Sequence, residues 1–184
     1  MGGFRHLADR EVAAGHRIRF VRATFEAPDG TTFERDVIRD HRVVAMVPVL
    51  DDGRTVVLVR QYRGAVDREM LEIPAGLCDV AGEDDPEATA RRELVEEVGL
   101  EATHLELLAT IHQSAGITDE HGLIYLATGL RAVDDDRQGI EEAHMTVEHL
   151  DLGDLDAAIA DGRLTDAKTL IGLLRARDRP RAEA

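Results

Sequence analysis

The sequence predicts an α+β fold in which helices pack against a mixed β-sheet. Alternating segments joined by turn residues open the chain, apolar strands surround one clear helix, and two helical segments close it. This order of elements differs from a βαβ repeat. The chain also lacks a GxGxxG or Walker A loop, which argues against a dinucleotide-binding Rossmann domain and against a P-loop NTPase.

Two strand–turn–strand units are predicted early in the chain. Residues His16–Glu26 and Thr31–Arg39 alternate in polarity around the turn sequence APDG, which predicts a hairpin. The stretch 42–62 has denser apolar runs on either side of a DDG turn, so its strands should be more deeply buried.

The later elements are shorter strands and closing helices. A strand in the sequence EMLEIPAG breaks at Pro74, and further strands are predicted at 102–113, 121–130 and 145–152. A polar loop, Arg131–His144, precedes the last strand, and loops of that length are usually functional or mobile. Two closing helices are predicted at 154–162, capped by Asp151 or Asp154, and at 165–177, capped by Thr165.

The clearest helix is predicted from Pro86 to Val98. Asp85 suits the N-cap, proline suits the first helical position, and Gly99 suits the C-terminal cap.

This helix carries three carboxylates on one arc. At about 100° per residue, Glu97 lies about 40° to one side of Glu93 and Glu96 about 60° to the other. Like charges at this spacing repel, and Arg92 can relieve only Glu96 at i+4. The arc is either a solvated acidic face or a site for a hard divalent cation, which takes oxygen ligands.

Composition narrows the possible function classes. With 184 residues and 43% apolar content, the chain should form one globular domain with a real core, either alone or with a small appendage. A net charge of −15 argues against sequence-independent nucleic-acid binding and against anionic membrane surfaces. We read neither a signal peptide nor a membrane span. The single cysteine, Cys78, predicts a protein of the reducing cytoplasm.

The segment EIPAGLCDVAGEDDPEATARRELVEEVGL, residues 72–100, resembles the Nudix box of the Nudix hydrolases. The second half of the box matches at every specified position, namely at Arg92, Glu93, Leu94, Glu96, Glu97, Gly99 and Leu100. The first half departs from the family pattern. The box glycine corresponds to Gly76, the following loop is longer, and Asp84 or Glu83 stands where the first glutamate belongs.

Flanking motifs resemble the ADP-ribose pyrophosphatase branch of this family. They are RQYR at 60–63, SAGITDE at 114–120 and IEEAHMTV at 140–147. The branch usually has a proline where Ala115 stands, so this position departs from the pattern.

The resemblance implies a Nudix-type α/β/α sandwich and roles for individual residues. The implied Mg²⁺ or Mn²⁺ ligands are Glu93, Glu96, Glu97 and the backbone carbonyl of Ala75. The general base is implied at Glu142, with Glu141 as the alternative. Candidate substrate contacts are Arg63 for a phosphate, Arg35, and Glu120 for a ribose hydroxyl. Arg92, Gly76 and Gly99 are implied to have structural roles, Arg92 by orienting a box carboxylate.

The function implied is Mg²⁺-dependent hydrolysis of a nucleoside diphosphate sugar, with ADP-ribose giving AMP and ribose 5-phosphate. The alternatives are a GDP-mannose or other sugar-nucleotide pyrophosphatase, and a Nudix-like module that binds such a molecule without cleaving it. The expected organisation is an N-terminal β-region at 1–40 that helps build a homodimer and its substrate pocket. A Nudix domain at 41–178 and a flexible tail at 179–184 follow.

Overall fold

The computed structural model describes residues 3–78, 85–134, 137 and 139–179. It contains two compact units. The first is formed by Met1–Arg42 with His112–His121, and the second by Val43–Ile111 with Gly122–Ala184. None of the helices that the structure describes has the length and apolar character needed to cross a membrane.

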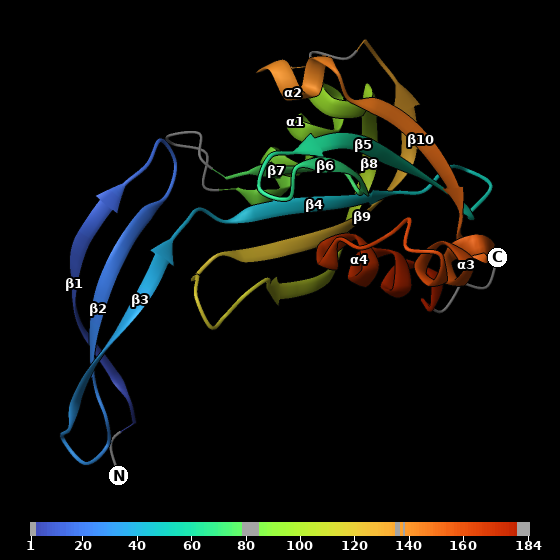
Figure 1. The fold of residues 1–184 in the computed structure, drawn as a ribbon. Helices are drawn as coiled ribbons and strands as arrows, with labels where there is room; N and C mark the ends of the chain where they lie inside the picture. Colours follow the sequence, from blue (N-terminus) through green and yellow to red (C-terminus); the bar gives the residue numbers. More distant parts are fainter. Residues whose placement is uncertain (1–2, 79–84, 135–136, 138, 180–184) are drawn as a thin grey trace. The chain divides into compact units, whose positions relative to one another are not determined.

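The first unit contains an antiparallel sheet in the order β1-β2-β3 (Figure 1). Its strands are β1 (Arg5–Ala14), β2 (Arg19–Glu26) and β3 (Thr32–Arg39). The predicted hairpin is confirmed in β2 and β3, whose facing residues Phe25 and Phe33 stack with ring centroids 5.6 Å apart. Strand β1 was not predicted, because its sequence RHLADREVAA lacks a buried face and every one of its residues is exposed.

The second unit contains two sheets. One has the order β7-β4-β9-β8, from β7 (Ala75–Leu77), β4 (Val43–Pro48), β9 (His121–Ala132) and β8 (Leu100–His112). The other has the order β10-β5-β6, from β10 (Thr146–Asp151), β5 (Thr55–Arg63) and β6 (Arg68–Glu72). Because β4 runs parallel to β9 and antiparallel to β7, the sheet is mixed, as the sequence predicts.

The second strand–turn–strand unit bridges these two sheets. Strands β4 and β5 form as predicted, but only the pair Val49 and Val56 joins them as a bridge. Every residue of β4 is buried, and its side chains alternate between two apolar clusters. Ala45 and Val47 face the larger cluster, which both sheets and α4 share, whereas Val44 and Met46 face α1. Because β7 and β9 pair with the two edges of β4, its backbone groups need no further partner in β5.

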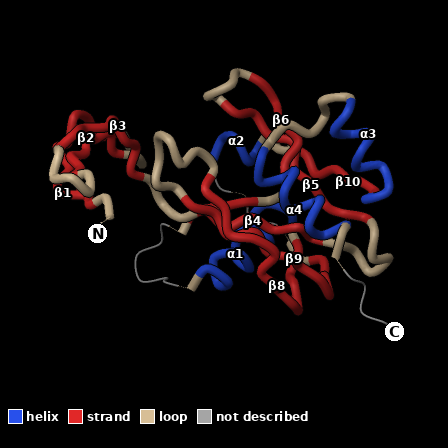
Figure 2. Tube along the Cα trace, turned by 90° about the horizontal axis from the view of Figure 1, so that it is seen from below, coloured by secondary structure: helices blue, strands red, loops and turns tan. Residues whose placement is uncertain are grey.

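The helices lie on opposite sides of these sheets, with α1 and α2 on one side and α3 and α4 on the other (Figures 1 and 2). Their bounds are α1 (Pro86–Val98), α2 (Gly139–Ala143), α3 (Leu155–Ala160) and α4 (Ala167–Arg177), with a 3₁₀ turn at Leu152–Asp154 before α3. The sandwich predicted from the sequence is therefore present in this unit.

Helix α1 begins and ends where the sequence predicts. The Asp85 side chain accepts a hydrogen bond from the Glu87 backbone N–H at 3.0 Å, and Gly99 closes the helix with φ 63°. Two other predictions are corrected. The cap of α4 is Asp166, whose carboxylate accepts from the Thr169 N–H at 2.9 Å, and not Thr165. The loop 131–144 also contains the short helix α2.

Candidate active site

The acidic arc of α1 is not a solvated face. Glu93 is 8% exposed and Glu97 only 4%, although both are charged residues in a chain already rich in carboxylates. Burying a carboxylate is costly unless a partner compensates for the lost hydration. The first of the two interpretations of this arc, a solvated acidic face, is therefore wrong for Glu93 and Glu97.

Gly76 makes room for the Glu93 carboxylate. A Cβ at this position would lie 1.9 Å from Glu93 Cδ and 2.2 Å from Glu93 Oε1. These distances are far inside van der Waals contact, so only glycine lets the carboxylate lie over the backbone of β7. This contact explains physically why the box pairs a glycine with this glutamate.

The two other box contacts orient the remaining carboxylates. The Ala75 backbone N–H donates to Glu97 Oε2 at 3.0 Å, which ties α1 to β7. Arg92 Nη1 lies 2.8 Å from Glu96 Oε2 and 2.9 Å from Glu93 Oε1. Arg92 thus contacts two box carboxylates, Glu93 and Glu96. The alternatives Asp84 and Glu83 lie outside the described residues.

The electrostatics of this group fit a divalent cation. Burial raises the pKa of Glu93 to about 7, with Arg92 opposing the rise and Glu96 and Glu142 adding to it. Burial also raises the pKa of Glu97 to about 8, against the effect of the Ala75 N–H. A bound cation would reverse these shifts and keep the carboxylates ionised.

The described side chains do not yet form a complete cation site. Within the described ranges, no group of three or more His, Cys, Asp or Glu side chains is arranged to hold a metal ion. Arg92 and the Ala75 N–H instead bond the three box carboxylates. The donor set is nevertheless of the right kind, because hard cations such as Mg²⁺ take carboxylate and carbonyl oxygens.

The candidate base belongs to the same group of carboxylates. Glu142, in α2, is half-buried and acts electrostatically on both Glu93 and Glu97. Helix α2 also contacts β5. The structure therefore brings the loop residue close to the box, whereas the Glu141 side chain lies outside what is described.

The candidate phosphate ligand Arg63 sits at the end of β5 beside the box. Its guanidinium lowers the pKa of Glu97, which shows their proximity. It also forms a two-pronged pair with Glu72, at 2.8 Å from Nε to Oε1 and 2.7 Å from Nη2 to Oε2. Lys168, at the start of α4, donates to the same Glu72 carboxylate.

This Glu72 network is a feature that the sequence did not reveal. Glu72 is 1% exposed, and burial raises its pKa, but Arg63 and Lys168 outweigh burial and hold the pKa at about 2. The only sequence feature that pointed to Glu72 was its place at the charged end of a strand that looked buried. No sequence feature pointed to Lys168, because its partner Glu72 lies far away in the sequence.

The other two candidate substrate contacts belong to the first unit. The Arg35 guanidinium lies over the Phe33 ring at 4.8 Å from its centroid and donates to the Glu34 carbonyl at 2.7 Å. Glu120 is bonded to Gln113, and burial together with the neighbouring Asp40 raises the pKa of Glu120.

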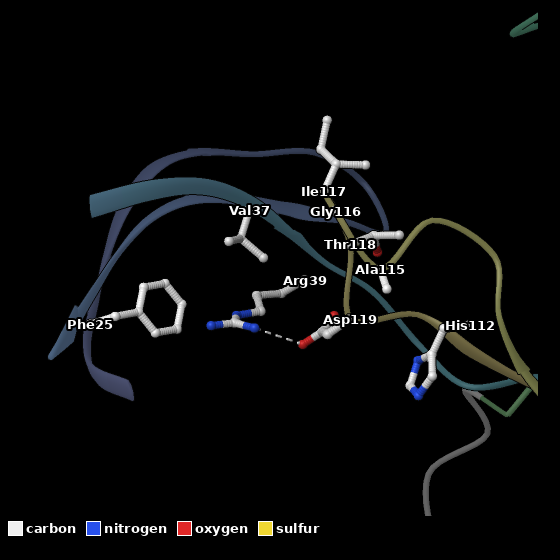
Figure 3. A pocket seen from close by; sticks show the side chains of 9 residues that line it. All are labelled: Phe25, Val37, Arg39, His112, Ala115, Gly116, Ile117, Thr118 and Asp119. Carbon is white, nitrogen blue, oxygen red and sulfur yellow. Dashed lines mark hydrogen bonds and ion pairs between the residues drawn. The ribbon is translucent and has the colours of Figure 1, made fainter. Parts of the chain in front are cut away.

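The first unit also contains a cavity of about 310 Å³ (Figure 3). Ala115, which replaces the family proline, lines it together with Phe25 and Val37. Arg39 points into the same space and bonds Asp119 at 3.1 Å.

Comparison with known proteins bears directly on this site. The Nudix domain family matches residues 39–170, a stretch that contains the whole box and most of the chain. The chain belongs to the Nudix family.

Several relatives of this Nudix protein have assigned activities. An ADP-ribose pyrophosphatase of Mycobacterium tuberculosis is 34% identical over 93% of the chain and 82% of its own length. An ADP-ribose pyrophosphatase of Bacillus subtilis is 30% identical over 89% of the chain and 86% of its own length. A GDP-mannose pyrophosphatase of Yersinia pestis is 35% identical over 64% of the chain and 61% of its own length.

A solved structure confirms the fold prediction. The crystal structure of an ADP compounds hydrolase matches with a TM-score of 0.82 and 22% identity, covering 97% of this chain and 94% of that one. The α+β class and the Nudix family predicted from the sequence are both confirmed.

Proposed function

We propose that this Nudix protein hydrolyses the pyrophosphate bond of a nucleoside diphosphate sugar in a Mg²⁺-dependent reaction. The observation that carries the proposal is the buried pair Glu93 and Glu97 on the box helix, with Glu93 lying over Gly76. Buried carboxylates grouped in this way are costly without a cation, and Mg²⁺ commonly binds a few carboxylates together with substrate phosphates.

The chain's own residues take separate roles in this proposal. Glu93, Glu96, Glu97 and the Ala75 carbonyl hold the cation, and Mn²⁺ would suit the same oxygens. Bound cations supply charge neutralisation of the diphosphate and activation of a water. Glu142 accepts the proton of the attacking water as general base. Because Glu142 lies in the short helix α2, closure of this helix over substrate would exclude bulk water.

Arg63 contacts the phosphate in this proposal. Its Nε and Nη2 are held by Glu72, yet 40% of its side chain is exposed beside the box. An arginine fixed in this way loses little further freedom on binding a phosphate oxygen. Arg35 and Glu120 remain the proposed contacts for the rest of the substrate.

ADP-ribose is the proposed substrate, giving AMP and ribose 5-phosphate. Two of the relatives that cover about nine tenths of the chain are ADP-ribose pyrophosphatases, whereas the GDP-mannose pyrophosphatase matches a shorter part. GDP-mannose is therefore the second candidate. A cytoplasmic homodimer is also proposed. The single cysteine favours the cytoplasm, and the dimer is suggested by β1, which is exposed along its whole length and displays Leu7 and Val12.

The test is one incubation of the purified protein with ADP-ribose, GDP-mannose, UDP-glucose, NADH and diadenosine tetraphosphate, read by mass spectrometry. It is run with Mg²⁺ and with a chelator. Metal-dependent conversion of ADP-ribose to AMP and ribose 5-phosphate is the expected result. Faster loss of another sugar nucleotide would overturn the substrate but retain the chemistry. Binding without any turnover would favour the non-catalytic module.

A further inference from the structure

One buried amide near the box has no partner. Gln61 in β5 is 7% exposed, and its Nε2 atom is buried without a hydrogen-bond partner among the described residues. Buried polar groups are nearly always bonded, and an unsatisfied donor destabilises the chain that contains it. An unpaired donor at this position therefore calls for an acceptor that arrives from outside the chain.

The position of Gln61 in β5 shows where that acceptor would lie. Alternation along a strand places Gln61 on the same face as Val59 and Arg63. The Arg63 end of this face lies near Glu97, as the effect of Arg63 on the pKa of Glu97 shows. Both α1 and α2, which carry the box and Glu142, contact β5.

The two strands that flank β5 each place a methionine beside Gln61. Strands β10 and β5 run antiparallel, with Thr146 opposite Arg60, so that continuing the pairing brings the buried Met145 toward Gln61. On β6, Met70 lies opposite Gln61. Two thioether side chains are poor hydrogen-bond acceptors, so these neighbours leave the amide donor unsatisfied.

We propose that Gln61 is a substrate-contacting residue, whose side-chain amide donates a hydrogen bond to a non-bridging phosphoryl oxygen of the bound diphosphate. This inference rests on the proposed function and adds a second phosphate donor beside Arg63. A phosphoryl oxygen is an acceptor only, which matches an unpaired donor. A neutral amide also contributes a donor without forming an ion pair with the box carboxylates.

The chosen variants separate this role from a packing role. Gln61→Met keeps the length and volume of the side chain and removes the amide, whereas Gln61→Glu places an acceptor where the donor was. Tyr62→Phe is the matched control, because it removes one polar atom from the opposite, exposed face of the same strand.

The expected result combines kinetics and stability. Gln61→Met should lower kcat/KM for ADP-ribose about ten- to a hundredfold, the effect of losing one hydrogen bond to a charged oxygen. Its melting temperature should equal or exceed that of the wild type, because the lost donor had no partner in the free protein. Gln61→Glu should lose at least as much activity, and Tyr62→Phe should keep the wild-type rate.

The opposite results are equally clear. Wild-type kcat/KM in Gln61→Met, or in Gln61→Glu, would overturn the proposal while leaving the pyrophosphatase function intact. A large fall in melting temperature with unchanged kinetics would mean that Gln61 only supports packing.

A binding measurement keeps the two proposals separable. If the wild type turns over none of the sugar nucleotides, ADP-ribose binding is measured by calorimetry with Ca²⁺ present. Weaker binding in Gln61→Met than in the wild type would then support the contact although hydrolysis had failed. Equal binding, or none in the wild type, would overturn it.

Discussion

The close approach of Gly76 to Glu93 makes Gly76→Ala the sharpest test of the box geometry. The added Cβ would lie 1.9 Å from Glu93 Cδ, whereas carbon atoms in contact lie about 3.5–4.0 Å apart. Glu93 must therefore withdraw by about 1.5 Å or more. A misplacement of about 1 Å in a site can reduce the rate about a hundredfold, so kcat/KM should fall by at least that factor. Overpacking should cost only about 1–3 kcal/mol of stability.

The assay is Mg²⁺-dependent ADP-ribose hydrolysis, with Mg²⁺ affinity taken from the metal dependence of the rate. Gly64→Ala is the matched control, because its Cβ would meet only Tyr62 Cε1 at an ordinary 3.8 Å. In a Glu93→Ala background, Gly76→Ala should have little further effect, because the two changes act on one contact. Wild-type kcat/KM in Gly76→Ala, or full additivity with Glu93→Ala, would refute this reasoning.

Three further predictions concern charges and caps. Glu97→Gln should abolish most turnover. It should leave the far-UV circular dichroism unchanged, because a glutamine oxygen can still accept a hydrogen bond from the Ala75 N–H. Near-wild-type activity in this variant would exclude the cation site. The pKa of Glu72 is about 2 in the folded protein and 4.5 in the unfolded chain. Its ionised form therefore contributes about 3 kcal/mol to the free energy of unfolding above pH 4.5, and this contribution should be lost as the pH falls toward 2. Urea titrations at several pH values should show a flatter acid limb in Glu72→Gln than in the wild type. Asp166→Ala should lower the unfolding free energy by about 0.5–2 kcal/mol, and Thr165→Ala should lower it less, because only Asp166 caps α4.

Local signals in the sequence determined α1 and the strand segments. The helix bounds follow from Asp85, Pro86 and Gly99, because caps act on neighbouring backbone groups and need no distant partner. The hairpin of β2 and β3 follows in the same way from alternation and turn residues. Strand β1 escaped prediction because alternation marks only strands with one buried face, and β1 has none.

Tertiary structure alone decided whether the acidic arc is solvated or buried. The helical spacing of Glu93, Glu96 and Glu97 is the same in a solvated face and in a buried site. Only the packing of α1 against β7 buries two of these carboxylates and raises their pKa values. Desolvation depends on atoms contributed by distant segments, which no local pattern specifies.

Around Arg63, too, the sequence determined the local position and the tertiary structure determined the partners. The sequence placed Arg63 directly after an apolar strand, and in the structure it is the last residue of β5. The pairing of Arg63 with Glu72, and of Glu72 with Lys168, depends on the turn after β5 and on the docking of α4. The sequence by itself therefore determined the family, the box helix and the strands that have a buried face, and it proposed the residue types of the site. The tertiary structure decided burial and pairing, because both depend on which segments meet in space.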